Sequence, residues 1–122
     1  LNFFYERKIL MGICTNKRQF VTEKLIQEMN LSKFFTTIVG ARDNIPLKPK
    51  PNMLILTMEG FNTTNKMFYM VGDTSNDIDA AKAANIKSIA VAGGYTDKDV
   101  NNLGATHTLK NMKDIIKLLG LS

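Results

Sequence analysis

Two aspartates stand at a point of the chain where a ligand could bind. Asp73 and Asp77 follow the apolar run 67–71, and Gly72 separates that run from the first aspartate. The run predicts a buried strand, so both carboxylates lie at its carboxyl end, where open α/β sheets bind ligands. Mg²⁺ takes oxygen ligands from one or two carboxylates, phosphate and water. A structural alternative stays open, in which Asp73 caps the next helix and Asp77 is a solvated carboxylate favoured by the helix dipole.

Thr15 and Asn16 occupy a similar position after an earlier strand. The run 8–14 predicts a strand, and a helix is expected to begin at Arg18. A hydroxyl group and backbone N–H groups therefore lie where a strand gives way to a helix N-terminus, which is a corner that binds phosphate oxygens. The alternative that Thr15 is only the N-cap of the helix also stays open.

The third candidate is a lysine in the segment Lys48-Pro49-Lys50-Pro51. Each proline restricts the residue before it, so Lys48 is expected to be held in an extended conformation just before a helix. An ammonium group held in place can neutralise charge on a transferring phosphoryl group. The segment could equally be a polar helix start with solvated lysines, and physical arguments alone do not rank Lys48 above Lys50.

The elements that must position these residues alternate along the chain. Strand-like apolar runs alternate with amphipathic stretches of helical length, a pattern typical of βα units that form a largely parallel sheet. We predict strands at 8–14, 36–39, 66–71, 87–92 and 107–109, and helices at 18–30, 49–59, 75–84, 96–100 and 112–119, after a helix tail at 1–6. Val21, Leu25 and Met29 share one helical face, and Asn85 can end its helix in the left-handed conformation.

Other residues are expected to be structural. His107 is predicted to lie at an edge strand away from the candidate site, Cys14 to be a small buried residue, and Asp79 to be a surface or packing residue beside the site. The large apolar side chains predicted to fill the core are Phe34, Phe35, Met53, Met58, Met67, Phe68 and Met70.

Composition bounds the function further. The 122 residues, 44% of them hydrophobic, suffice for one domain, and no apolar run approaches the roughly 20 residues that span a bilayer. A single cysteine cannot form an internal disulfide, which is typical of a cytoplasmic protein. The formal net charge is +5, but the lysines are scattered without a basic block, so we expect no nucleic-acid or membrane partner.

In combination, these residues resemble the haloacid dehalogenase-like hydrolase superfamily. Thr15, Lys48 and the pair Asp73/Asp77 match its second, third and fourth sequence motifs in order. The stretches GICTNK from Gly12, KPKP from Lys48 and VGDTSNDIDAAKAA from Val71 are most similar to phosphoglycolate phosphatase-like members. The resemblance covers nearly the whole chain, and the last motif is its most specific part.

The resemblance implies an α/β, three-layer Rossmann-like core with a mostly parallel sheet. It further implies that Thr15, with Asn16, binds the phosphoryl group, that Lys48 neutralises it and orients the nucleophile, and that Asp73 and Asp77 hold Mg²⁺. The Lys-Pro-x-Pro pattern favours Lys48 over Lys50. In such enzymes an aspartate attacks phosphorus to form an aspartyl-phosphate, and a second aspartate two residues later is the general acid and base.

The sequence departs from the family at this nucleophile. The first motif, Asp-x-Asp after an apolar strand, should precede all the motifs seen here, yet Asp77 and Asp79 lie on a predicted helix and Asp97 and Asp99 follow a Gly-Gly turn. The cap domain that selects substrate is also missing. We therefore expect residues 1–122 to be one partial core domain, truncated at its N-terminal side, that contains motifs two to four. The missing central strand would be disordered, cleaved or supplied by a second chain.

These observations lead to a functional hypothesis. The parent protein is expected to be a cytoplasmic, Mg²⁺-dependent phosphomonoester hydrolase that acts on a small phosphorylated metabolite, with this chain alone inactive. The alternative is a catalytically silent fragment, which binds anions and metal or has a regulatory role. Mutase and dehalogenase branches share the fold, although dehalogenases do not need the metal.

Overall fold

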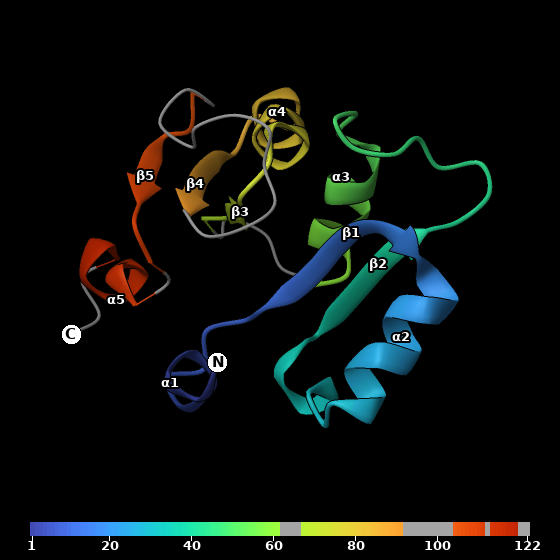
Figure 1. Ribbon diagram of the computed structural model, residues 1–122, viewed down its shortest axis with the longest axis horizontal. Coiled ribbons are helices and arrows are strands. Elements are labelled where there is room, and N and C mark those ends of the chain that lie inside the picture. Colours follow the sequence, from blue (N-terminus) through green and yellow to red (C-terminus); the bar gives the residue numbers. More distant parts are fainter. Residues whose placement is uncertain (62–66, 92–103, 112, 120–122) are drawn as a thin grey trace. The chain divides into compact units, whose positions relative to one another are not determined.

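The computed structural model describes residues 1–61, 67–91, 104–111 and 113–119 (Figure 1). The chain divides into two compact units, Leu1–Lys66 and Met67–Ser122, which are described separately below. Each unit contains its own parallel sheet, and the strands are β1 and β2 in the first unit and β3, β4 and β5 in the second.

The first unit is built around two parallel strands. Its described elements are α1 (Asn2–Glu6), β1 (Gly12–Arg18), α2 (Gln19–Glu28), a 3₁₀ turn (Ser32–Phe34), β2 (Thr37–Ala41) and α3 (Asn52–Glu59). Both α2 and α3 contact the two strands, and Figure 1 shows the helices on opposite sides of them. This gives the three-layer arrangement expected of an α/β core.

Strand β1 is irregular at its carboxyl end. It advances four residues, from Cys14 to Arg18, while β2 advances two, from Val39 to Ala41. The extra residues form a bulge, a feature that redirects side chains and is common beside active sites. The bulge needs a glycine opposite it, because a Cβ on Gly40 would lie 2.6 Å from the carbonyl oxygen of Lys17.

The side chain of Gln19 fastens the start of α2 to β2. Its amide nitrogen donates a hydrogen bond to the Ile38 carbonyl at 3.0 Å, and its amide oxygen accepts one from the Gly40 N–H. Thr22, in the next turn of α2, donates to the Arg18 carbonyl at 2.9 Å. These bonds hold the helix that follows the bulge against the neighbouring strand.

Helix α2 buries a face other than the one that contains its apolar stripe. Thr22 and Ile26 are buried, whereas Val21, Leu25 and Met29 are 46%, 41% and 56% exposed. Thr22 can be buried at the sheet because its hydroxyl group has a backbone partner.

The second unit is a three-stranded parallel sheet with β4 in the centre. Its described elements are β3 (Tyr69–Gly72), α4 (Ser75–Ala83), β4 (Lys87–Val91), β5 (His107–Leu109) and α5 (Asp114–Leu118). Helix α4 contacts β3 and β4, and its Ile78 is fully buried with Ala90 of β4. Ser88 and Thr106 exchange hydrogen bonds between backbone N–H and side-chain hydroxyl groups at 3.1 and 3.2 Å.

Most predicted elements are present, with small changes at their ends. The first strand begins at Gly12 and not at Lys8, because Lys8 has a φ of 58° and its N–H bonds the Tyr5 carbonyl at the end of α1. It continues past Cys14 to Arg18, so Thr15 and Asn16 lie within the strand and not after it, because the bulge lets the pairing with β2 resume at Arg18. Asn85 has the expected left-handed conformation, with a φ of 63°. The predicted helix at 96–100 lies outside the described residues.

The core predictions hold for some side chains and fail for one. Phe34 and Met53 are buried, and Phe35, Met58, Phe68 and Met70 are partly buried. Met67 is 68% exposed, so its assignment to the core is wrong. It precedes β3, which begins only at Tyr69, and therefore does not take part in the alternation of that strand.

Candidate active site

Thr15 and Asn16 lie in the bulge of β1, and both are partly buried. The hydroxyl oxygen of Thr15 accepts a hydrogen bond from the Lys17 N–H at 3.2 Å. The residue before the first turn of α2 is Arg18, and it makes no side-chain capping bond. Thr15 is therefore not the N-cap of α2, and its hydroxyl group keeps a proton that it can donate to a ligand.

The side chain of Asn16 joins the bulge to a distant segment. Its Oδ1 accepts a hydrogen bond from the Lys48 N–H at 2.9 Å, and its Nδ2 donates one to the Lys48 carbonyl at 3.0 Å. One carboxamide thus satisfies both backbone groups of a residue 32 positions away. The Lys48–Pro49 peptide bond that follows is cis.

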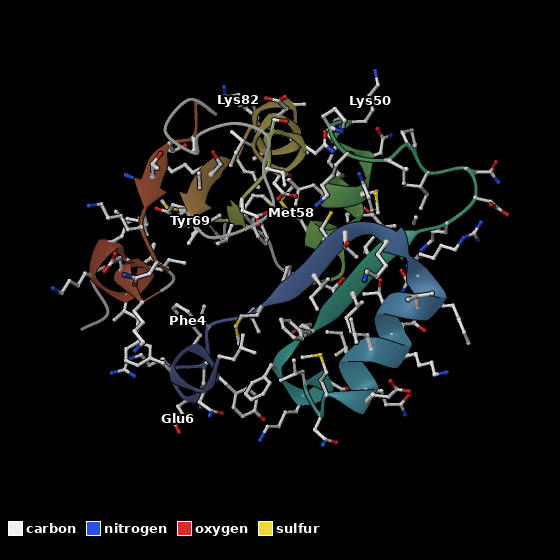
Figure 2. The ribbon with its side chains drawn as sticks, in the orientation of Figure 1. Phe4, Glu6, Lys50, Met58, Tyr69 and Lys82 are labelled. Atoms are coloured by element: carbon white, nitrogen blue, oxygen red, sulfur yellow. The ribbon has the colours of Figure 1, made fainter. Side chains whose placement is uncertain are left out.

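The ammonium group of Lys48 returns to β1. Its Nζ donates to the Cys14 carbonyl at 2.8 Å, and the residue is only 8% exposed. Lys50 is exposed, and Figure 2 shows its side chain extending away from the ribbon. Burial therefore ranks Lys48 above Lys50, because an ammonium with few water contacts interacts more strongly with a nearby anion.

The two aspartates lie in the second unit, at the carboxyl end of β3 and in the first turn of α4. Asp73 is partly buried and Asp77 is 9% exposed. The N-cap of α4 is Thr74, without a side-chain capping bond, so Asp73 does not cap this helix. Because Asp77 is buried, it is not a solvated surface carboxylate either.

Two neighbours fix the position of the Asp77 carboxylate. The Thr74 hydroxyl group donates a hydrogen bond to its Oδ2 at 3.2 Å. A Cβ on Gly72 would overlap the same carboxylate group, so only glycine permits this close approach. The side chain is thus held against the end of β3.

Oxygen donors of this kind suit Mg²⁺. The described residues contain no group of three or more His, Cys, Asp or Glu side chains that could hold a metal ion by themselves. Mg²⁺ does not need such a group, because it is bound through one or two carboxylates with water and substrate phosphate completing its ligands. Asp73 and Asp77 therefore fit this ion through their hard oxygens and their shared location.

The predicted residues fall into two groups, one in each unit. Lys48 contacts Asn16 and the Cys14 carbonyl beside Thr15 in the bulged part of β1, whereas Asp73 follows β3 directly and Asp77 lies in the first turn of α4. Sequence reasoning missed the carbonyl of Cys14 as the acceptor for Lys48, and it missed Thr74. The only available signal was the spacing of Thr74 three residues before Asp77, which places the two on neighbouring turns.

The residues expected to be structural agree with their predictions in part. His107 lies in β5 and is partly buried, and Asp79 is exposed on α4. Cys14 is partly and not fully buried.

No helix in the part of the chain that the structure describes is long and apolar enough to cross a membrane.

Comparison with known proteins decides the family. The sequence-family model of the haloacid dehalogenase-like hydrolases matches residues 1–91 of this chain. The chain belongs to the haloacid dehalogenase-like hydrolase family. Its β1 bulge, its Lys48 segment and its Asp73/Asp77 pair all lie within the matched residues.

Phosphoglycolate phosphatases are among the similar curated relatives. The enzyme of Escherichia coli K12 is 30% identical over 112 residues, which are 91% of this chain and 44% of that protein. The enzyme of Salmonella typhi is 31% identical, again over 112 residues that are 91% of this chain and 44% of that protein. The chain thus spans less than half the length of these haloacid dehalogenase-like relatives.

Solved structures agree with the fold. A haloacid dehalogenase-superfamily hydrolase from Ehrlichia chaffeensis superposes with a TM-score of 0.81 at 24% identity, covering 98% of this chain and 54% of the other. CbbY from Rhodobacter sphaeroides, solved in complex with phosphate, superposes with a TM-score of 0.76 at 20% identity. The superposition covers 90% of this chain and 50% of CbbY. The α/β architecture with parallel strands is therefore that of the family.

Proposed function

We propose that this chain forms the phosphate-binding and Mg²⁺-binding part of a phosphomonoester hydrolase that acts on a small phosphorylated metabolite. The contact between Lys48 Nζ and the Cys14 carbonyl carries the proposal, because it holds a buried cation beside Thr15. The names of the relatives support a phosphatase, and phosphoglycolate is the first substrate to test.

The residues have separate tasks in this proposal. Thr15 donates its hydroxyl proton to a phosphoryl oxygen, and backbone N–H groups of the bulge add further donors. Lys48 neutralises charge on the phosphoryl group as it is transferred and orients the attacking carboxylate. Asn16 belongs with these two residues at the phosphate subsite.

Asp73 and Asp77 would hold Mg²⁺ in the same proposal. The bound ion supplies positive charge that stabilises the phosphate oxygens during transfer. Thr74 keeps the Asp77 carboxylate oriented through its hydrogen bond, and Gly72 leaves room for it. Such supporting contacts are typical of metal sites.

The nucleophile of the proposed reaction lies outside this chain. An aspartate would attack phosphorus, the bond to the ester oxygen would break, and the alcohol of the metabolite would leave with a proton to give an aspartyl-phosphate. Water would then hydrolyse this intermediate to orthophosphate and the free aspartate. Asp77 and Asp79 have the required spacing, but they lie within α4 and not directly after a strand. Asp97 and Asp99 lie outside the described residues. We propose that a preceding segment or a second chain supplies the aspartate together with a strand of the sheet.

A second candidate is a catalytically silent module that binds phosphate and Mg²⁺ and regulates another protein. The position of the possible aspartate pair within α4 favours it for this chain alone. The two candidates share a binding site and differ in turnover.

Hydrolysis of an aryl phosphate in the presence of Mg²⁺ tests the proposal. The assay compares this chain with a version extended on its N-terminal side to include an Asp-x-Asp strand, and each is made with native Asp73 and with Asp73→Asn. We expect turnover only by the extended protein with native Asp73. Addition of a chelator should abolish that turnover.

The other outcomes are equally informative. Turnover by the 122-residue chain itself would show that its nucleophile is present and would overturn that part of the proposal. If neither protein hydrolyses the aryl phosphate or phosphoglycolate, yet the chain binds orthophosphate, the regulatory candidate replaces the phosphatase.

A further inference from the structure

We propose that Asn16 is a positioning residue, whose carboxamide sets the place of the Lys48 ammonium at the end of β1. The inference rests on the proposed function, because it assigns Asn16 a role that acts through Lys48. It also gives the Asn16 side chain a task other than direct contact with phosphate.

The hydrogen bonds on both sides of Lys48 support this role. The Asn16 side chain is bonded to the N–H and to the carbonyl of the same residue, at 2.9 and 3.0 Å. Two bonds from one planar amide fix both the position and the orientation of a backbone, whereas one bond would leave it free to rotate. The Lys48 backbone thus has a defined place relative to the bulge.

The side chain of Lys48 closes the arrangement. Its Nζ bonds the Cys14 carbonyl at 2.8 Å, only two residues before Asn16 in β1. The lysine is therefore attached to one short stretch of strand at its backbone and at its ammonium group. Because a lysine side chain has four methylene groups and many rotamers, holding both its backbone and its ammonium group reduces the entropy lost when the ammonium binds an anion.

Direct phosphate binding by Asn16 is the competing role. A carboxamide has two N–H donors and two acceptor lone pairs on its oxygen, so one donor and one lone pair remain after the bonds to Lys48. The two roles predict different coupling between Asn16 and Lys48. A positioning residue loses its effect once Lys48 is removed, but a direct ligand does not.

Amide hydrogen exchange measures the bond to Lys48 without any ligand. Prolines at 46, 49 and 51 have no amide hydrogen, so few amides of this segment exchange. We expect Asn16→Ala to speed exchange at the Lys48 amide at least about tenfold, while the Lys50 amide, bonded to the Leu47 carbonyl at 3.0 Å, keeps its rate. Asn52→Ala, at an exposed position of α3, is the matched control and should change neither amide.

Asn16→Asp is a milder second variant. It keeps an oxygen that can accept the Lys48 N–H but loses the donor to the Lys48 carbonyl, so we expect a smaller acceleration at Lys48. If Asn16→Ala unfolds the first unit, exchange at Lys50 also rises, and Asn16→Asp then decides the question. Unchanged exchange at the Lys48 amide in a folded variant overturns the inference.

A double-mutant cycle with orthophosphate and Mg²⁺ tests the consequence for binding. Calorimetric titration compares the chain with Asn16→Ala, Lys48→Ala and the double variant. We expect each single variant to weaken phosphate binding about tenfold, and the double variant to bind no more weakly than Lys48→Ala. Additive losses in the double variant would show that Asn16 contacts phosphate itself and would overturn the positioning role.

The two proposals fail in different ways. Absence of orthophosphate binding by the unmodified chain counts against the phosphate-binding function, whatever the exchange data show. Phosphate binding that persists unchanged in Asn16→Ala, with Lys48→Ala impaired, counts against Asn16 alone and leaves the proposed function in place.

Discussion

At the scale of the residue, the site depends on a few close approaches between backbone and side chain. Gly40 lies opposite the β1 bulge, and Gly72 lies against the Asp77 carboxylate. Neither glycine has a positive φ. Glycine is needed at these two positions because a Cβ atom would clash with neighbouring atoms, and not because of the backbone conformation. These glycines place the bulge and the carboxylate where the proposed chemistry needs them.

Gly40→Ala should disturb the bulge. The new Cβ would lie 2.6 Å from the Lys17 carbonyl oxygen and 2.8 Å from the Gln19 backbone, and backbone atoms cannot rotate away. We expect a loss of about 1–3 kcal/mol in the free energy of unfolding, measured by urea denaturation. Gly12→Ala is the control, because its two nearest contacts are side-chain atoms of Thr37 and Phe61, and its nearest backbone contact, the Thr37 carbonyl oxygen, would lie farther away at 3.2 Å. An equal loss in both variants would contradict this account.

Asp77→Asn should weaken Mg²⁺ binding at least about tenfold, because a charged oxygen ligand becomes a neutral amide. The substitution keeps the size of the side chain, so the buried position of Asp77 is preserved. Calorimetric titration with MgCl₂ measures the effect. Asp79→Asn changes the same charge at an exposed position of α4 and should leave the affinity as it is. A similar loss in both variants would mean that net charge, and not a site, holds the ion.

At the scale of the element, α2 is fastened to the sheet by polar contacts as well as by burial. Gln19 bonds two backbone groups of β2, and Thr22 bonds the end of β1. Ile26 is 8% exposed and provides the apolar contact of the same face. The helix therefore holds the bulged end of β1 and the carboxyl end of β2 together, which keeps Thr15 and Asn16 in place.

Neighbouring positions of α2 should respond differently to truncation. Ile26→Ala removes buried methyl and methylene groups and is expected to cost about 2–4 kcal/mol of unfolding free energy. Leu25→Ala removes a side chain that is 41% exposed and should cost less than about 1 kcal/mol. Urea denaturation of both variants gives the comparison. If Leu25→Ala costs as much as Ile26→Ala, the face that contains Val21 and Met29 is the buried one.

At the scale of the whole molecule, charge and strand pairing are the informative properties. The formal net charge of +5 is spread along the chain without a basic block.

Among the described strands, β1 pairs only with β2, and β3 pairs only with β4, so each sheet has an edge open to a further strand. We propose that a strand from a preceding segment or a second chain pairs with one of these open edges and carries the nucleophile.

Scattered lysines should not give stable binding to nucleic acid. We expect electrophoretic mobility shifts of a DNA duplex to be weak at about 50 mM salt and absent at about 150 mM, because few phosphates would be neutralised together. A shift that persists at the higher salt concentration would contradict this expectation. Orthophosphate binding measured at the same two concentrations serves as the comparison, since one buried lysine should be less sensitive to salt.

Much of the fold and the position of the site follow from local sequence. Alternating apolar runs and amphipathic stretches indicated the parallel α/β arrangement, and polar residues after apolar runs marked Thr15 and Asp73, although β1 continues through Thr15 to Arg18. Asn85 adopts the left-handed conformation that its residue type allows. These features are predictable because strand ends, turns and caps depend on residues close together in the chain.

The tertiary structure decided what depends on distant partners. It buried Lys48 and left Lys50 exposed, joined Asn16 to a residue 32 positions away, and buried Thr22 in place of the apolar stripe at Val21. Residue types alone could not reveal these outcomes, because burial and hydrogen bonding are set by the segments that pack together. The sequence by itself determined which chemical groups stand at the ends of the strands, and only packing decided which neighbours hold them there.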